Sequence, residues 1–403
     1  MKFYKEIDFQ DSPIGAIPKE WDAHKLSDLS LMITDGSHFS PKHQRSGYPL
    51  ATVANMRDNC IDINSCYRIT KEDFEKLSTS GDKPEINDVL FSKDGTVGQC
   101  IVFNQNVDLI VLSSIAIIRP DLKKASAYFL KYTLQSPASL NRISSSKTGS
   151  AIKRIVLRDL NSIKVALPRD IKEQKRVVEV LGVVDSAIEL TDKVIAKTKR
   201  LKKGLMQQLL THGIGHSEYK DTPIGKTPKT WLVARLGDIV SLEYGKGLPQ
   251  NSRLEGRYPV VGSNGIVGYH NEALVKGPGI VVGRKGTIGA VSWIDEDFWP
   301  IDTTYYVKTD RGDVYLRWLF FELSYLNLAR LHLADVVPGL KRDLAYSRTL
   351  PLPPLPEQQK IACIIIAVDK KLSIEQNVKT RLERVKRGLM DLLLTGKVRI
   401  KVD

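Results

Sequence analysis

Two long stretches of the chain repeat apolar residues at steps of three and four, the spacing that places them on one face of an α-helix. The first stretch runs from Glu173 to Thr211 without a proline. Its apolar or neutral positions are Val177, Leu181, Val184, Ile188, Thr191, Ile195 and Thr198. The second begins with Ile361, Ile365, Val368 and Leu372, becomes polar at Glu375 and Lys379, and resumes at Leu382 and Leu389. We predict two helices of 39 residues, each about 58 Å long.

Prolines mark the start of both helices: Pro168 precedes the first, and a proline-rich run, Pro351–Pro356, precedes the second. Proline is tolerated at a helix start but not in its interior. A helix of this length with a single apolar stripe needs a partner, and the other long helix is the obvious one. If an approximate two-fold axis relates the two halves of the chain, the helices pair antiparallel, with one domain at each end of the rod.

The segments outside these helices favour short strands, because they are apolar, rich in β-branched residues and bounded by Gly, Asn and Asp. The expected strands are Tyr48–Val53, Asp88–Ser92, Cys100–Phe103 and Leu109–Arg119, then Tyr258–Val261, Gly279–Val282, Ala290–Ile294 and Thr304–Val307. Helices are expected at Ala125–Gln135 and Val314–Asn327. Each half is therefore predicted to contain an α+β domain.

An internal repeat organises the chain. Asp11–Asp28 and Asp221–Asp238 match without a gap at 9 of 18 positions, including Trp21 and Trp231, which we interpret as core or interface anchors of the frame. Arg200–Thr211 and Arg384–Thr395 match at 8 of 12 positions. The same offset of 184 residues aligns Glu173-Gln174 with Glu357-Gln358, and VLFSKDGTVG at 89–98 resembles IVVGRKGTIG at 280–289. Each half is thus a repeated frame around a divergent insert, as two modules with different targets would require.

Composition narrows the class of protein. A net charge of +14 favours a polyanionic partner, with nucleic acid the leading candidate. The first ten residues do not resemble a signal peptide, and the longest apolar run, Ile361–Val368, is too short to span a membrane. The four cysteines do not have zinc-site spacing, and we expect them to be reduced and buried, which favours a cytoplasmic location.

Motifs for catalysis are not found in the sequence. An adenine methyltransferase would need an Asn/Asp-Pro-Pro-aromatic loop, but Leu352 and Leu355 flank Pro353-Pro354. The glycine-rich stretch Gly277–Gly289 lacks the Gly-Lys pair of a phosphate-binding P-loop. Two histidines, His212 and His216, are four positions apart, but we expect no metal site among the histidines. We expect a chain without a catalytic or metal site.

A set of short motifs, in their order along the chain, makes the sequence similar to the specificity subunits of type I restriction–modification enzymes. The motifs are the Pro-x-Gly-x-x-Pro-x-x-Trp openings at Pro13 and Pro223, the turn Thr34–His38, the segment Tyr258–Gly265, the two Gly-Thr-x-Gly turns and the helix opening Leu355–Lys360. The resemblance covers essentially the whole chain. The first helix departs from it, opening with Ile171-Lys172-Glu173-Gln174 rather than Leu-Pro-x-Glu-Gln.

The resemblance implies two target recognition domains separated by two long antiparallel coiled-coil helices. It places the first recognition domain at residues 1–168, the central helix at 169–213, the second recognition domain at 214–352 and the C-terminal helix at 353–403. Each domain would recognise one half of a bipartite site in double-stranded DNA. The helices would dock two adenine methyltransferase subunits, and restriction subunits would join. S-adenosylmethionine, ATP and Mg²⁺ are expected in those partner subunits, with no cofactor in this chain.

Candidate DNA contacts follow from exposed-looking polar turns and cations. They are Ser37, His38, Lys93, Lys147, Lys153, Arg154, Asn264, Arg284, Lys285, Lys341 and Arg342, with the last two taken as counterparts of the cations at 147–154. Ser37 and His38 form either an ordinary β-turn or a loop presented to DNA. Lys93, Arg284 and Lys285 precede Gly-Thr turns whose backbone could approach a phosphate, or they are solvated hairpin charges.

Candidate docking residues lie near the ends of the long helices: Lys199, Lys203, Gly204, Arg387 and Gly388. The cations belong either to a solvated helix face or to a surface for DNA or a partner. Each glycine lowers helix stability by about 1 kcal/mol relative to alanine. Its presence in both copies suggests close helix–helix approach or contact with a partner, and drift is the alternative. A freestanding DNA-binding protein remains the alternative, although it gives no reason for the two heptad helices.

Overall fold

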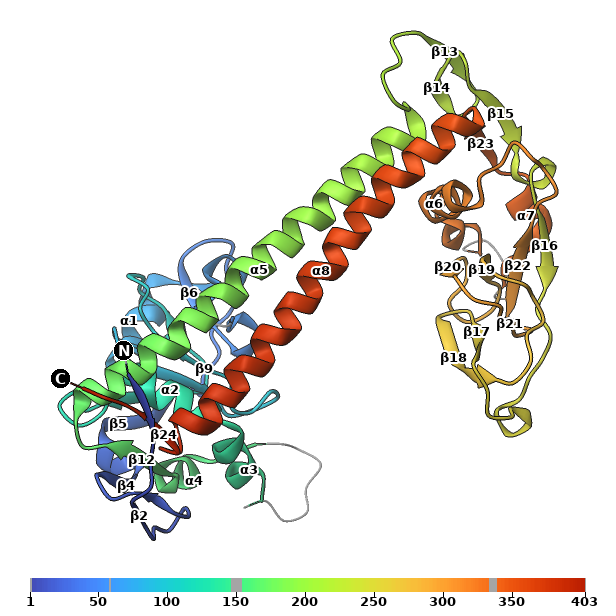
Figure 1. Cartoon of the computed structure of the whole chain (residues 1–403). Helices are drawn as coiled ribbons and strands as arrows, with labels where there is room; N and C mark the ends of the chain where they lie inside the picture. Colours follow the sequence, from blue (N-terminus) through green and yellow to red (C-terminus); the bar gives the residue numbers. More distant parts are fainter. Residues whose placement is uncertain (1, 58, 146–153, 333–338, 403) are drawn as a thin grey trace. The chain divides into compact units, whose positions relative to one another are not determined.

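The computed structural model describes residues 2–57, 59–145, 154–332 and 339–402 (Figure 1). The chain divides into two compact units, which we call unit 1 (Met1–Asp192 with Val378–Asp403) and unit 2 (Lys193–Asn377). Each unit contains one mixed α and β domain together with a portion of both long helices.

The two long helices are α5 (Ile171–Thr211) and α8 (Leu355–Leu393), and within each unit they run in opposite directions (Figure 1). In unit 1 the Lys386 Nζ lies 2.6 Å from the Asp185 Oδ1. In unit 2 the Lys202 Nζ lies 2.6 Å from the Asp369 Oδ1. Both residue types recur at the 184-residue offset, so the second ion pair is a copy of the first with the helices exchanged. The predicted antiparallel pairing is confirmed in each unit.

The heptad positions are the covered positions of these helices. On α5, Val177, Leu181, Thr191, Ile195 and Thr198 are buried, and Val184 and Ile188 are half-buried. On α8, Ile361 and Ile365 are buried, while the polar positions Glu375 and Lys379 are only half-buried. The apolar stripe read from the sequence is thus the packing surface of both helices.

Each unit is built on a four-stranded sheet of the same topology. In unit 1 the strand order is β5 (Ser30–Asp35), β11 (Ile115–Pro120), β8 (Val89–Ser92) and β9 (Cys100–Val102). In unit 2 it is β16 (Ser241–Tyr244), β22 (Thr304–Lys308), β19 (Gly279–Gly283) and β20 (Val291–Ile294). All neighbouring strands in both sheets are antiparallel. The repeat seen in the sequence is therefore a repeat of topology.

Smaller sheets complete both units. Unit 1 has the three-stranded sheet β10 (Ile110–Val111), β6 (Tyr48–Ala51) and β7 (Tyr67–Ile69), and the pairs β2 (Phe9–Gln10) with β3 (Ile17–Pro18), β12 (Lys164–Pro168) with β4 (Trp21–Lys25), and β1 (Phe3–Lys5) with β24 (Val398–Ile400). Unit 2 has β18 (Gly265–His270), β17 (Tyr258–Gly262) and β21 (Trp299–Pro300), and the pairs β13 (Tyr219–Thr222) with β14 (Gly225–Pro228) and β15 (Leu232–Arg235) with β23 (Thr349–Leu352).

Short helices close the cores. Unit 1 contains α1 (Lys71–Thr79), α2 (Ala127–Gln135), α3 (Pro137–Ser145) and α4 (Leu157–Ser162), and unit 2 contains α6 (Leu316–Leu326) and α7 (Arg342–Tyr346). The helices predicted around residues 125–135 and 314–327 are confirmed as α2 and α6. Trp21 and Trp231 are fully buried, one in the main core of each unit, as predicted.

The structure differs from the sequence expectations at three places. The segment predicted as one strand over 109–119 is two strands, β10 and β11, because a turn moves the chain from one sheet to the other. The second long helix ends at Leu393, and the following residues include β24, which pairs with β1. All four cysteines are free, but Cys363 is exposed and Cys60 is only partly buried, so the predicted burial is wrong for these two.

Candidate nucleic-acid interface

The edge of the unit 2 sheet carries a cationic cluster over an aromatic ring. Tyr244, the last residue of β16, is 50% exposed. The guanidinium carbon of Arg284, just after β19, lies 5.2 Å from the centre of the Tyr244 ring, and that of Arg342 lies 4.6 Å from it. Arginine stacks well on aromatic faces and keeps its charge at any physiological pH. Two cations are therefore held on one half-exposed ring.

Backbone carbonyls orient both arginines. Arg284 donates from its Nε and Nη2 to the Asp302 carbonyl oxygen, at 3.1 and 2.7 Å. Arg342 donates from its Nη1 to the Leu242 carbonyl oxygen at 3.4 Å. Between them the Leu340 backbone N–H donates to the Arg284 carbonyl oxygen at 2.9 Å, which ties the start of α7 to the end of β19. The structure thus brings together Arg284 and Arg342, two candidates 58 positions apart in the sequence.

The neighbouring candidates Lys285 and Lys341 are both exposed. Lys285 precedes Gly286, whose φ of +73° suits glycine and lets the chain turn sharply. Below the cluster, the buried Tyr305 lies with its ring centre 5.1 Å from that of Tyr244 and donates its hydroxyl to the Leu340 carbonyl. Burial, followed by the neighbouring Tyr244 hydroxyl, raises the pKa of Tyr305 to about 12, so it remains a neutral hydrogen-bond donor at physiological pH.

The equivalent edge of unit 1 is different. Lys93, which follows β8 as Arg284 follows β19, is 1% exposed and forms an ion pair with Asp35 at the end of β5. A lysine so deeply buried presents no ammonium group at the surface. The interpretation of Lys93 as a phosphate contact is therefore not supported, because the Asp35 carboxylate already neutralises it.

Arg154 is exposed, and its Nε lies 3.3 Å from the Asp94 Oδ1. Lys147 and Lys153, the other candidates of this loop, lie outside the described residues. The Ile155 N–H bonds to the Lys93 carbonyl just as the Leu340 N–H bonds to that of Arg284. Ile155 is therefore the equivalent of Leu340. Two residues further along each chain segment, Leu157 is the equivalent of Arg342. The assumed correspondence of Arg154 with Arg342 is therefore wrong.

Ser37 and His38 have separate environments. Ser37 is 3% exposed, and its hydroxyl donates to the Phe39 carbonyl oxygen at 2.8 Å and accepts the Phe39 N–H at 3.1 Å. These contacts make Ser37 part of an ordinary turn. The His38 ring is 69% exposed, with its Nε2 3.3 Å from the Asp35 Oδ2. Of this pair, only His38 is available to an external ligand.

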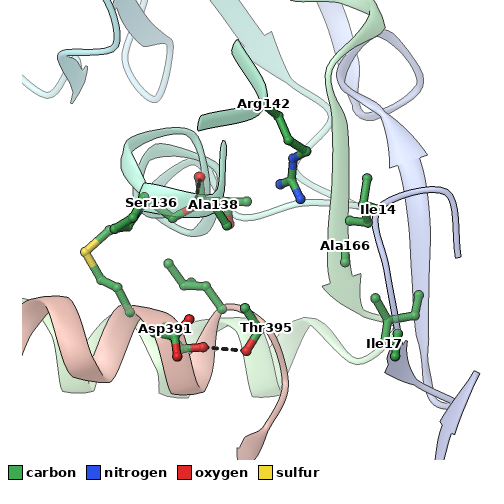
Figure 2. Close-up of a pocket in the computed structure, with 13 residues that line it drawn as sticks. Ile14, Ile17, Ser136, Ala138, Arg142, Ala166, Asp391 and Thr395 are labelled. Atoms are coloured by element: carbon green, nitrogen blue, oxygen red, sulfur yellow. Dashed lines mark hydrogen bonds between the residues drawn. The ribbon is translucent and has the colours of Figure 1, made fainter. Parts of the chain in front are cut away.

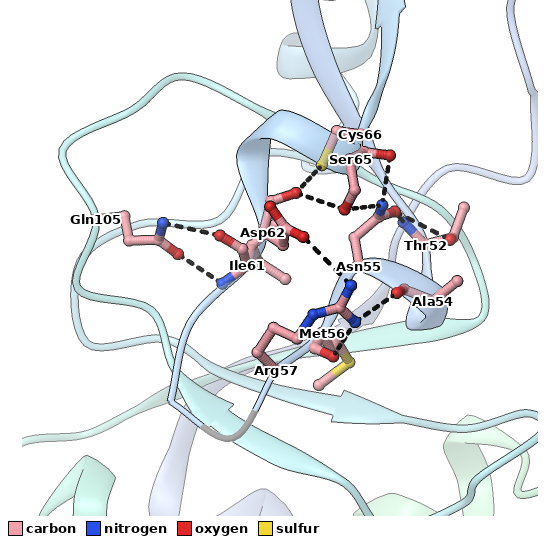
Figure 3. A network of polar contacts seen from close by, with 10 residues as sticks. All are labelled: Thr52, Ala54, Asn55, Met56, Arg57, Ile61, Asp62, Ser65, Cys66 and Gln105. Atoms are coloured by element: carbon pink, nitrogen blue, oxygen red, sulfur yellow. Dashed lines mark hydrogen bonds and ion pairs between the residues drawn. The ribbon is translucent and has the colours of Figure 1, made fainter. Parts of the chain in front are cut away.

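The two units differ after the equivalent strands β6 and β17. In unit 2, β17 and β18 form a tight hairpin with the candidate Asn264 exposed at its tip. In unit 1, a long loop follows β6 and is held by a polar network (Figure 3). Asn55, 5% exposed, accepts the Thr52 N–H at 2.8 Å and donates to the Ser65 carbonyl at 2.9 Å, and Gln105 makes two hydrogen bonds to the Ile61 backbone. The repeated frame therefore carries different segments at this place in the two units.

Lys199, Lys203 and Arg387 are exposed on the long helices, as are both helical glycines. A Cβ atom added at Gly204 or at Gly388 would meet no atom within 4 Å. The explanation of these glycines by close approach of the chain's own helices is therefore wrong, because the space beside them is open among the described residues. Contact with a partner and drift remain as explanations.

The structure also explains a repeated motif that was not among the candidates. The Gln174 side chain accepts the Ser126 N–H at 2.9 Å and donates to the Lys124 and Pro168 carbonyls. Gln358 accepts the Tyr315 N–H at 2.7 Å and donates to the Asp313 and Pro353 carbonyls at 2.8 Å. Each glutamine fixes the start of α2 or α6 to its long helix. The repeat identified these residues, but no local pattern indicated their role.

A pocket lies in unit 1 beside the end of α8 (Figure 2). Its lining includes Ile14, Ile17, Thr133, Arg142 and Leu394, and burial lowers the pKa of the Arg142 guanidinium. Unit 2 has a corresponding pocket, whose lining includes Ile224, Thr227, Glu322, Arg330 and Leu210. Both pockets lie among residues of the repeated frame rather than at the divergent sheet edges, so we assign them to the packing of the frame.

Within the described ranges, no group of three or more His, Cys, Asp and Glu side chains is placed to hold a metal ion. None of the helices in the described part of the chain is long and apolar enough to cross a membrane.

Comparison with known proteins agrees with this architecture. The sequence model of the type I restriction modification DNA specificity domain matches residues 18–200 and again 228–384. Two proteins of Methanocaldococcus jannaschii, named as the MjaX and MjaVIII type I restriction enzyme specificity subunits, are 27% and 24% identical to the chain. Both alignments cover all of this chain and 99% and 98% of the relatives.

Solved structures share the fold. The crystal structure of a type I restriction–modification S subunit from M. genitalium has a TM-score of 0.63 at 17% identity, covering 95% of this chain and 97% of that one. A chain from a structural study of type I complex assembly has a TM-score of 0.58 at 15% identity, covering 94% and 99%. The chain belongs to the family of type I restriction–modification DNA specificity subunits. The predicted family and fold class are confirmed.

Proposed function

We propose that this chain is the non-catalytic subunit that gives a type I restriction–modification enzyme its DNA specificity, with each unit recognising one half of a bipartite site. One observation carries the proposal: the two units repeat the same sheet and the same glutamine clamps, yet differ in the surfaces after β6 and β17 and at the sheet edge. Sequence is recognised through side chains at base edges, so different surfaces on one frame suit two different half-sites.

Exposed apolar residues on the long helices support the docking of two adenine methyltransferase subunits there. Leu201 on α5 is 54% exposed, and Val385, its repeat counterpart on α8, is 50% exposed. Gly204 and Gly388 lie one turn further along the same helix faces, with open space beside them. A small residue beside an exposed apolar one allows a partner helix to approach closely. Because the surface occurs twice, it suits two copies of one partner.

In this function the chemistry belongs to the partners. S-adenosylmethionine would bind the methyltransferase subunits, and restriction subunits would use ATP and Mg²⁺. The net charge of +14 supports association with DNA. The complex would act on DNA inside the cell.

Methylation mapping tests the proposal. The chain is expressed with its neighbouring adenine methyltransferase in a host free of DNA methylation, and modified adenines are located by sequencing. We expect a motif of two short half-sites with a fixed gap, which disappears when this chain is omitted. Methylation that is absent, random or confined to a continuous site would contradict the bipartite model. A freestanding DNA-binding protein would then be the better account.

A further inference from the structure

The four positions of the unit 2 cluster have equivalents in unit 1, because the sheets share one topology. Tyr244 pairs with Tyr305, which pairs with Val282, and in unit 1 Asp35 pairs with Ala116, which pairs with Phe91. Phe91 and Val282 occupy the same place in the repeated segments 89–98 and 280–289. Tyr244 is therefore the equivalent of Asp35. The Leu340 N–H bonds to the Arg284 carbonyl as the Ile155 N–H bonds to the Lys93 carbonyl. Counting from these bonds, the unit 1 equivalents of Arg284, Lys285 and Arg342 are Lys93, Asp94 and Leu157.

The charges at these positions are opposite in sign. Unit 2 has one neutral residue, Tyr244, and three cations, which gives +3. Unit 1 has one cation and two carboxylates at the equivalent positions, which gives −1, and its cation is buried with Asp35. Even the nearby Arg154 is paired with a carboxylate, that of Asp94. The same place on the frame is therefore neutralised in unit 1 and strongly positive in unit 2.

The unit 2 cations are ready for an anion. Within the described ranges, no carboxylate forms an ion pair with Arg284, Lys285 or Arg342. Contacts with the Tyr244 ring and with backbone carbonyls already hold the two guanidinium groups, so little side-chain freedom remains to be lost on binding. In the same part of the chain, the Nη1 of Arg284 and the Nε and Nη2 of Arg342 have no hydrogen-bond acceptor. Oriented guanidinium donors are well suited to a phosphate.

We propose that Tyr244, Arg284, Lys285 and Arg342, the phosphate cradle, bind consecutive backbone phosphates of the DNA half-site at unit 2, one phosphate to each cation, and that unit 1 has no such anchor at the equivalent place. This inference rests on the proposed function, and it adds an asymmetry: the two half-sites differ in how strongly salt weakens their binding. The cradle positions the DNA without selecting its sequence, because a phosphate carries no base information.

The size of the effect follows from counterion release. Each phosphate contact contributes about 0.9 to the slope of log K against log salt, so two arginine contacts contribute about 1.8. Neutralising both arginines is expected to lower the magnitude of the log K against log salt slope by about 2. It is expected to weaken DNA binding about 60-fold at about 0.1 M salt. Lys285 alone should contribute about 1 to the slope.

The experiment uses the full chain in complex with its methyltransferase, and a labelled duplex that carries the site found by methylation mapping. The dissociation constant is measured by fluorescence anisotropy over a series of KCl concentrations. The variant is R284Q/R342Q. The matched control is R158Q/R169Q, which removes two exposed unit 1 arginines that already lie beside carboxylates. We expect the slope to fall by about 2 in the variant and by less than about 0.5 in the control.

A second variant guards against misfolding. Lys285→Gln alters an exposed side chain with no hydrogen bond or ion pair to the described residues, so its fold should be unchanged. It should lower the slope by about 1 and leave the methylated motif the same. Wild-type slopes in both variants, or equal losses in variant and control, would overturn the cradle while leaving the bipartite function intact. Failure of the wild-type complex to prefer its site would instead count against the proposed function.

Discussion

Glu322 offers a test of how unit 2 is packed. It lies on α6 with its side chain 1% exposed, and among the described residues its Oε2 has no hydrogen-bond partner. Burial raises the pKa of Glu322 from its ordinary value of 4.5 to about 8, because the ionised carboxylate is desolvated. Lys226 and Arg330 line the same pocket. The folded unit therefore holds a proton on Glu322 over a pH range in which the unfolded chain has lost it.

The sign and size follow from proton linkage. Between pH 4.5 and 8 the folded state binds more protons than the unfolded state, so stability falls as pH rises through this window and levels off above it. From about pH 6 to pH 8 the loss is about 2 kcal/mol. For a unit of this size that corresponds to a fall of about 6 °C in the midpoint of thermal unfolding. Glu322→Gln is uncharged and should lack this component.

Tryptophan fluorescence is the assay, because four of the five tryptophans, Trp231, Trp293, Trp299 and Trp318, are in unit 2. Thermal midpoints of the full chain are compared at pH 6 and pH 8 for the wild type, for Glu322→Gln and for Glu272→Gln, an exposed control. The difference between wild type and Glu322→Gln should change by about 2 kcal/mol between the two pH values. A difference that stays constant would refute the burial of a neutral carboxyl at this position.

Three further predictions concern the helices and their clamps. Alanine at Gly204 and Gly388 should raise thermal stability by about 1 kcal/mol per site, whereas leucine at both should leave the chain folded but abolish co-purification with the methyltransferase; undiminished co-purification would exclude these faces as docking surfaces. Gln358→Leu removes three hydrogen bonds and should destabilise unit 2 by about 3 kcal/mol in the same fluorescence assay; a change below about 0.5 kcal/mol would contradict the clamp. Arg399→Met leaves Glu173 buried without its two-bond partner and should cost unit 1 about 3 to 5 kcal/mol, measured by circular dichroism; a stable variant would show that the carboxylate reaches water.

The frame could be predicted from sequence because its signals are local or repeated. The heptad stripes, the proline stops and the paired openings around Trp21 and Trp231 each depend on spacing within one segment. Periodicity could not show that residues 109–119 change sheets, because both strands of that segment are apolar. It also gave no sign of β24, whose partner strand, β1, lies near the other end of the sequence.

The candidate site was less accessible for a physical reason. A lysine before a Gly-Thr turn looks the same whether it is solvated or buried, and only the distant Asp35 decides the outcome for Lys93. The sequence analysis did not single out Tyr244, because the two arginines that lie over its ring are distant in the sequence and only the fold brings them together. Charge identified the cations, but the fold determines which of them have counterions.

The composition of unit 1 from two distant stretches of chain has a consequence for biosynthesis. Its core includes Met390, Leu393 and Ile400, and its buried Glu173 meets Arg399, whereas unit 2 is a single continuous segment. At the ribosome, unit 2 is therefore complete while unit 1 still lacks its last strand and helix segment. At typical elongation rates the nascent first domain waits about 10 to 40 s for these residues. Unit 2 is thus the first that can finish folding, although it is synthesised second. Chaperones would bind unit 1 during this interval, while its core is still exposed.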